Sequence, residues 1–178
     1  MIQHQPFLSI CIPSYNSVEL ISRSIHSILK QSFNDFEIII SDDSTNEDVF
    51  EFYNLLKDNR ISYFKHRSIT TATENWNFVL KKAKGRYKML LHHDDYFRNN
   101  LILEKIYNDF LKNGEMMVYF LNFINEDKFK KFYYNKFSMK QIFKHPDNLL
   151  YVNYFSTPSC LIINQKVDLY YNEELKWL

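Results

Sequence analysis

Short apolar runs alternate with amphipathic stretches over most of the chain. The runs lie at residues 7–12, 36–40, 61–64, 87–91, 116–123 and 160–163. Such runs indicate buried β-strands. After each of the first four runs, apolar residues recur at spacings of three and four, which is typical of one face of an α-helix. Strands that alternate with helices in this way predict right-handed crossovers and a mostly parallel central sheet, which is an α/β fold.

The expected helices carry recognisable end signals. Ser17 is a candidate N-cap for the first helix, and either Thr71 or Thr73 can cap the third. Gly85 follows the third helix, at the C′ position where glycine is common. Farther along the chain the pattern weakens, and we expect only a short helix at 138–144 before the last strand.

Composition narrows the class of protein. A length of 178 residues and a hydrophobic fraction of 46% predict a single globular domain. The chain has 22 basic and 21 acidic residues, a net charge of +1, which gives no support to a general nucleic-acid binder. Cys11 and Cys160 each lie in an apolar run, so we expect buried, reduced thiols and a cytoplasmic location. We expect neither a signal peptide nor a membrane span, because no stretch approaches the ~20 apolar residues of such a helix.

Two of the expected strands end in paired carboxylates. Asp42 and Asp43 follow the second run, and Asp94 and Asp95 follow the fourth. Burying an unpaired carboxylate in a dry interior is costly, so each strand should end at its pair. The carboxyl ends of parallel strands meet at one edge of the sheet, which is where ligands bind. Each pair alone is also explained by capping of the following helix, but two pairs at equivalent edges favour a shared site.

Four clustered acids suggest a divalent cation together with a phosphorylated ligand. Mg²⁺ and Mn²⁺ take oxygen ligands from carboxylates and from substrate phosphates. The only glycines are Gly85 and Gly114, which excludes the common Gly-rich phosphate loops. A phosphate must therefore be held by other means, and a metal ion is the obvious candidate. We expect a nucleotide and a divalent ion at this edge of the sheet.

Five segments of the chain, taken together and in order, resemble family 2 glycosyltransferases. They are SICIPSYN at 9–16, SILKQSF at 27–33, FEIIISDDS at 36–44, AKGRY at 83–87 and LHHDDY at 91–96. The resemblance implies a GT-A fold over a single domain, 1–178, a nucleotide-diphosphate sugar donor that is most often a UDP-sugar, and a divalent metal, Mn²⁺ or Mg²⁺. It further implies an inverting transfer of the sugar to an acceptor hydroxyl, as in polysaccharide biosynthesis.

The resemblance also assigns roles to individual positions. The positions that match the nucleotide-binding part of the family are Pro13, Tyr15, Asn16, Asp43, Asn77 and Asp94, and the position that matches the metal ligand is Asp95. Within this set, Tyr15 would lie against the base, Asp43 would accept a hydrogen bond from the base, and Asp94 would approach the ribose. Asp95 would bind the metal that bridges the diphosphate.

The chain departs from the family pattern at two positions. His92 stands where the family often has the first Asp of Asp-x-Asp-Asp, and we interpret it as a neutral substitution because the last two acids are the ones that match. The alternatives are that His92 is a spare metal ligand or that it forms a zinc site with His93 and the two acids. Trp76 stands where many members have an arginine before Asn77, which weakens any claim about a cation there.

The family's general base is not matched within the chain. Residues 171–175 resemble the lead-in to the acidic pair that supplies it, so we expect the base beyond Leu178 and interpret Glu173 and Glu174 as surface residues. On this hypothesis the polypeptide binds a donor but transfers sugar poorly or not at all without further chain or a partner. The alternative is a catalytically impaired, truncated paralogue that acts only as a nucleotide-sugar-binding module.

The acceptor side is less specified than the donor side. The acceptor would be a glycan, a lipid-linked sugar or a protein, and the family position of residues 156–159 places them on its side of the site. We expect a cytoplasmic protein that is at most peripheral at the inner face of a membrane.

Overall fold

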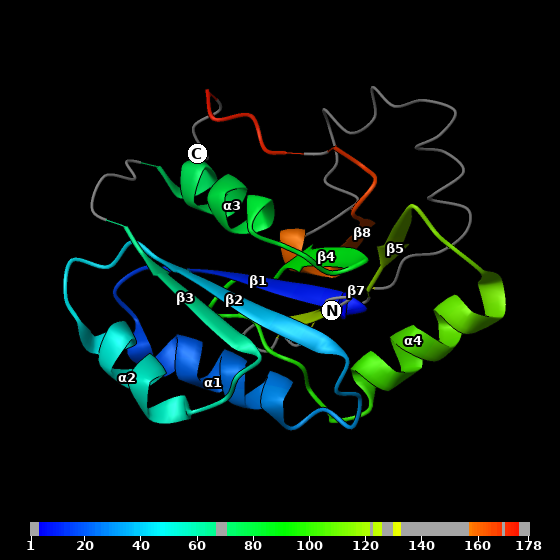
Figure 1. Cartoon of the computed structure of the whole chain (residues 1–178), viewed down its shortest axis with the longest axis horizontal. Coiled ribbons are helices and arrows are strands. Elements are labelled where there is room, and N and C mark those ends of the chain that lie inside the picture. Colours follow the sequence, from blue (N-terminus) through cyan, green and yellow to red (C-terminus); the bar gives the residue numbers. More distant parts are fainter. Residues whose placement is uncertain are drawn as a thin grey trace.

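A six-stranded sheet forms the centre of the protein, with helices on both of its faces (Figure 1). The computed structural model describes residues 4–66, 71–121, 123–125, 130–132, 157–168 and 170–174. In the order in which they lie side by side, the strands are β3 (Ile61–Lys65), β2 (Phe36–Asp42), β1 (Leu8–Ser14), β4 (Tyr87–Leu90), β8 (Leu161–Asn164) and β5 (Val118–Phe120).

The remaining elements surround this sheet. The helices are α1 (Val18–Leu29), α2 (Asp48–Leu56), α3 (Ala72–Lys81) and α4 (Ile102–Asn113), and a 3₁₀ turn at Pro158–Cys160 leads into β8. A separate two-stranded antiparallel ribbon joins β6 (Phe123–Asn125) and β7 (Lys130–Phe132).

The first four strands run parallel, which confirms the α/β expectation. β1 lies between β2 and β4, and Leu8 pairs with both Phe36 and Tyr87. β8 is antiparallel to both of its neighbours, β4 and β5, so the complete sheet is mixed. The strand expected at 116–123 is shorter than predicted, and the helix expected at 138–144 lies outside the described residues.

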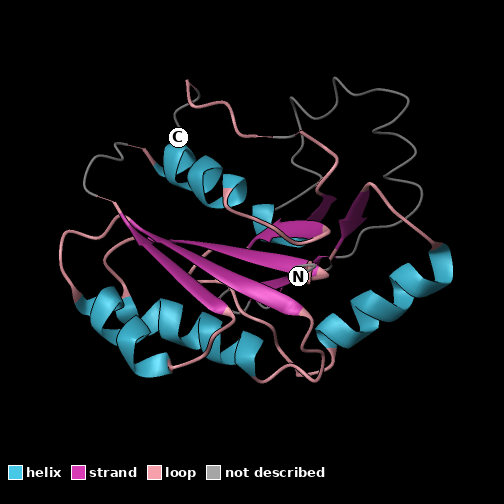
Figure 2. Ribbon diagram, viewed as in Figure 1, coloured by secondary structure: helices cyan, strands magenta, loops and turns pink. Residues whose placement is uncertain are grey.

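Helices cover both faces of the sheet, and this explains the continuous apolar runs. Ile10 and Ile12 of β1 belong to the larger core, which includes side chains of α1, α2 and α4. Cys11 points to the opposite face, where it packs with Ile39 and Leu90 beneath α3. Figure 2 shows the same division, with α3 on the face opposite the other three helices.

Both cysteines are buried free thiols, as expected, and burial raises the pKa of Cys11. In the described part of the chain, none of the helices has the length and apolar character needed to cross a membrane.

Gly85 has a different role from the one predicted. α3 ends at Lys81, and Gly85 does not have the positive φ of a helix C′ glycine. Instead the chain passes very close to β1 here, and a Cβ on Gly85 would lie 2.7 Å from both the backbone nitrogen and the Oγ of Ser9. The Gly85 N–H donates to Ser9 Oγ at 2.8 Å, and that hydroxyl donates to Glu37 Oε1 at 2.6 Å. Glycine is needed for this close approach rather than for a left-handed turn.

Substituting Gly85→Ala should therefore destabilise the protein by overpacking, by about 1–3 kcal/mol in free energy of unfolding. Urea denaturation followed by circular dichroism measures this loss. The double variant Ser9→Ala/Gly85→Ala removes the hydroxyl contact but keeps the contact with the backbone nitrogen. It should recover only part of the loss, and full recovery would contradict the backbone-approach explanation.

Candidate active site at the carboxyl edge of the sheet

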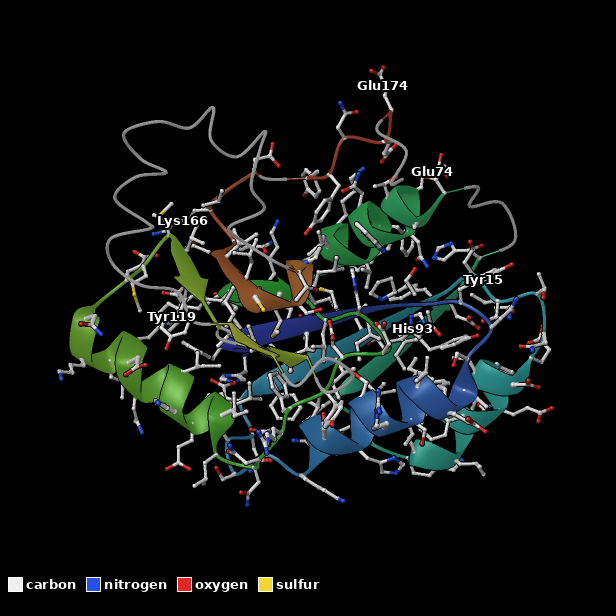
Figure 3. The ribbon with its side chains drawn as sticks, turned by 180° about the vertical axis from the view of Figure 1, so that it is seen from behind. Tyr15, Glu74, His93, Tyr119, Lys166 and Glu174 are labelled. Carbon is white, nitrogen blue, oxygen red and sulfur yellow. The ribbon has the colours of Figure 1, made fainter. Side chains whose placement is uncertain are left out.

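A cavity of about 960 Å³ opens at the carboxyl ends of the parallel strands. Its lining comes from the ends of the parallel strands, from the loops that follow them and from the first half of α3. The lining residues are Pro13, Ser14, Tyr15, Asp43, Ser44, Thr45, Glu47, Lys65, His66, Thr71, Ala72, Asn75, Trp76, His92, His93 and Asp94. Of the predicted nucleotide-binding residues, four line it: Pro13, Tyr15, Asp43 and Asp94. Figure 3 labels Tyr15 and His93, which border the cavity.

Asn16 joins the first two strand-end loops to each other. It has a φ of 48°, in the left-handed region that asparagine tolerates better than most residues. Its Oδ1 accepts a hydrogen bond from the Thr45 N–H at 2.9 Å, and its own N–H donates to Ser44 Oγ at 2.8 Å. Asn16 is not part of the cavity lining, but these bonds fix the loops that carry Tyr15 and Asp43. The ring of Tyr15 itself is exposed.

The two members of the first acid pair have different surroundings. Asp42 is fully buried, and its carboxylate accepts hydrogen bonds from the Ser44 N–H and hydroxyl, from Tyr63 OH at 2.6 Å and from Lys65 Nζ at 3.2 Å. Asp43 lines the cavity, where burial raises the pKa of its carboxyl while nearby His66 opposes the shift. Asp42 therefore holds the loop, and Asp43 is left to face a ligand.

Sequence reasoning missed the residues that end β3. Lys65 bridges Asp42 and the Asn46 carbonyl oxygen, which lies 2.5 Å from Nζ. His66 lines the cavity with its ring against Phe78, and burial lowers the pKa of the imidazole. Their position in the sequence could have identified them, because both residues follow an expected strand and so lie at the same edge of the sheet as the acid pairs.

The second acid pair lies in a turn that is held from several sides. The Asp95 N–H donates to the His92 carbonyl at 3.0 Å, and His93 Nδ1 lies 3.2 Å from the Pro13 carbonyl oxygen. From α1, the Arg23 guanidinium donates to the Asp94 carbonyl at 2.8 Å. The same guanidinium stacks on the Tyr96 ring, 4.5 Å from its centroid.

His92, Asp94 and Asp95 come together as a candidate metal centre. Each offers one ligand atom, and these atoms lie within 4.8 Å of one another. A set of one imidazole and two carboxylates fits a divalent cation. Thr157 adds an oxygen nearby, with its hydroxyl 3.5 Å from Asp95 Oδ2. Interpreting His92 as a neutral substitution did not anticipate this grouping, because the sequence does not show which way the ring points.

Helix α3 contributes one asparagine to the cavity and another to a different contact. Thr71 caps α3 in a capping box with Glu74, which settles the choice between the two threonines. Asn75 lines the cavity, and its amide bonds to Ser41, donating to the carbonyl at 3.3 Å and accepting from the hydroxyl.

The side chain of Asn77, by contrast, donates to the Tyr171 carbonyl and accepts from the Tyr171 N–H, both at 2.8 Å. It is not part of the cavity lining, so its predicted role at the nucleotide stays a prediction that this geometry does not support. Asn77 also donates to Glu173, whose exposure agrees with its interpretation as a surface residue.

The family model described as Glycosyl transferase family 2 matches residues 9–170. The chain belongs to this family.

Curated relatives agree with the family assignment. One relative is the Escherichia coli UDP-Glc:alpha-D-GlcNAc-diphosphoundecaprenol beta-1,3-glucosyltransferase WfaP, to which the chain is 34% identical over 122 residues. The matched region covers 68% of this chain and 48% of that protein. The chain is 38% identical over 93 residues to the Campylobacter jejuni GalNAc(5)-diNAcBac-PP-undecaprenol beta-1,3-glucosyltransferase, covering 51% of this chain and 30% of that one. This member of the family thus spans about half or less of the length of these relatives.

Solved structures confirm the GT-A fold. Staphylococcus aureus TarS 1–349 in complex with UDP superposes with a TM-score of 0.70 at 20% identity, over 95% of this chain and 51% of that one. The Pyrobaculum calidifontis mannosyltransferase PcManGT, in complex with GDP-Man and Mn²⁺, gives a TM-score of 0.58 at 16% identity, over 71% of this chain and 38% of that one. At these identities the likeness concerns the fold alone.

The different surroundings of Asp42 and Asp43 can be tested by matched substitutions. Asp42→Asn should lower the free energy of unfolding by about 3 kcal/mol, because it breaks a buried charge pair and leaves several donors without their acceptor. Asp43→Asn should leave stability unchanged or slightly raised, since burial disfavours the ionised form of that carboxyl. Chemical denaturation of both variants checks this, and equal losses would show that Asp42 has no special structural role.

Proposed function

We propose that this protein binds a UDP-sugar in the cavity at the carboxyl edge of the sheet and transfers the sugar, with inversion, to a hydroxyl of a lipid-linked glycan. The observation that carries the proposal is the gathering of Tyr15, Asp43 and Asp94 around one cavity, next to a cluster that fits a divalent cation. Relatives whose names specify UDP-glucose or an undecaprenol-linked sugar support the choice of donor and acceptor.

The surroundings of each cavity residue suit a particular role in binding the nucleoside. The exposed ring of Tyr15 offers a flat apolar face on which a uracil can stack. Asp43, whose loop is fixed by Asp42 and Asn16, accepts a hydrogen bond from the base. Asp94 accepts from a ribose hydroxyl, and Pro13 forms the wall behind the nucleoside.

The diphosphate lies toward the turn that carries Asp95. When bound there, a divalent cation such as Mn²⁺ or Mg²⁺ neutralises the charge that develops on the departing nucleoside diphosphate. The carboxylate of Asp95 holds this cation, and Arg23 keeps the turn in place through the Asp94 carbonyl. Lys65 does not supply the neutralising charge, because Asp42 already engages it.

Transfer with inversion is a single displacement at the anomeric carbon. It requires a carboxylate to take the proton from the acceptor hydroxyl. The predicted base beyond Leu178 stays a prediction, and the contact of Asn77 with Tyr171 fixes the segment that would lead to it. A lipid-linked acceptor fits a protein that works at the inner face of a membrane, where it would be peripheral.

Calorimetric titration tests the donor site. UDP should bind more tightly with Mn²⁺ than without it, and Asp95→Asn should abolish the difference while leaving metal-independent binding in place. Asp43→Asn should weaken UDP binding about tenfold or more, because a hydrogen bond to a charged group is lost. Asp35→Asn, at the opposite edge of the sheet, is the matched control and should bind like the unmodified chain.

A transfer assay separates an enzyme from a binding module. Incubation with UDP-glucose, Mn²⁺ and an undecaprenyl-diphosphate-linked sugar should yield a new glycosidic bond of inverted anomeric configuration, detected by proton NMR of the product. Tight UDP binding without transfer, by this chain and by any longer form of it, would favour the binding-module alternative. Retention of configuration would refute the single displacement.

A further inference from the structure

We infer that His92 is a direct ligand of the divalent cation, together with Asp95 and with one carboxylate oxygen of Asp94, whose other oxygen stays available to the ribose. The cation then has a nitrogen donor where the family pattern offers a carboxylate. This inference rests on the proposed function, because it places the cation in the same cavity as the nucleotide. The inference goes beyond the proposed function because it assigns to His92 the choice of metal ion at this site.

The spacing of the three side chains supports coordination. Their ligand atoms lie within 4.8 Å of one another. At metal–oxygen distances of about 2.1 Å, two ligands on opposite sides of one ion are about 4.2 Å apart. The spacing of the three ligand atoms is therefore close to the spacing of ligands around one ion.

One contact of the ring and one of the backbone hold His92 in place. The ring packs on Trp76 with centroids 4.8 Å apart and an angle of 35° between the planes. Its backbone N–H donates to Ser159 Oγ at 2.9 Å, which ties the end of β4 to the turn before β8. Ligand residues need such support, because a metal site depends on side chains whose orientation is fixed in advance.

The hydrogen-bonding state of the ring also favours a ligand. In the described part of the chain, His92 Nε2 is buried and has no hydrogen-bond partner. A histidine that served only to pack on Trp76 would bury this polar nitrogen without compensation. A neutral imidazole has a lone pair to offer to a metal. His66 Nε2 is also buried without a partner among the described residues, so it is the position of His92 beside Asp94 and Asp95 that selects His92 as the ligand.

An imidazole ligand has a consequence for metal choice. Mg²⁺ favours oxygen ligands, whereas imidazole suits transition metals, whose affinity for nitrogen sites rises along the series from Mn²⁺. The site should therefore discriminate against Mg²⁺. Replacing His92 by aspartate, the residue that the family often has there, should shift the preference toward Mg²⁺.

Pulsed electron paramagnetic resonance of Mn²⁺ tests the inference directly. The chain with Mn²⁺ and UDP should show coupling of the metal to a directly bound ¹⁴N, and labelling the histidines with ¹⁵N should change it. His92→Gln should remove the coupling and weaken Mn²⁺ binding by roughly tenfold or more. His93→Gln, the neighbouring substitution outside the cluster, should keep the coupling. Near-ultraviolet circular dichroism establishes that both variants fold.

The outcomes separate this inference from the proposed function. If Mn²⁺ strengthens UDP binding but no nitrogen coupling is seen, His92 is a packing residue and the inference fails while the donor site stands. If the coupling survives in His92→Gln and disappears in His93→Gln, the metal ligand is His93, and the inference about His92 is wrong. If Mn²⁺ neither binds nor affects UDP, both proposals fail. A second readout is the ratio of Mn²⁺ to Mg²⁺ affinity, which should fall in His92→Asp.

Discussion

The parallel pairing of β1 with strands on both of its sides is the constraint on which the rest of the structure depends. Because β2 and β4 both pair with it in the same direction, their polar ends emerge at one edge. Ser14 at the end of β1 lies opposite Asp42 at the end of β2. Backbone hydrogen bonds therefore bring together side chains that are far apart in the sequence.

Polar contacts then fix the loops at this edge. Asp42, Asn16 and Asn75 each join at least two loops or elements, and each is engaged by several hydrogen bonds. Asp42 and Asn75 are buried, and leaving a buried polar group unsatisfied costs more than the net gain of a typical hydrogen bond, so their arrangement is strongly preferred over a rearranged one. The result is a cavity whose lining includes Asp43 and Asp94, while Asp42, beside Asp43, is used for structure.

The sequence is sufficient for the fold class and for the expectation that polar strand ends meet at one edge of the sheet, because hydrophobic periodicity and paired acids at strand ends depend on local order along the chain. It is not sufficient where the answer depends on distant residues. The sequence predicts a helix-end role for Gly85, yet the need for glycine there comes from its close approach to β1. The contact of the Asn77 side chain with the Tyr171 backbone could not be read from the sequence either. The orientation of His92 depends on Trp76 and Ser159, neither of which is adjacent to it in the sequence.

Because β8 lies antiparallel beside β4, residues from two distant parts of the sequence meet at the site. The loops that carry Tyr15, Asp43 and Asp94 come from successive strand–helix units within the first hundred residues. Thr157 and Ser159, by contrast, approach the turn after β4 from the last quarter of the chain. Sequence changes in that late segment can therefore alter the surroundings of the turn after β4 without disturbing the loops that carry Tyr15 and Asp43. A fold organised in this way can keep one side of its cavity constant while the other side varies.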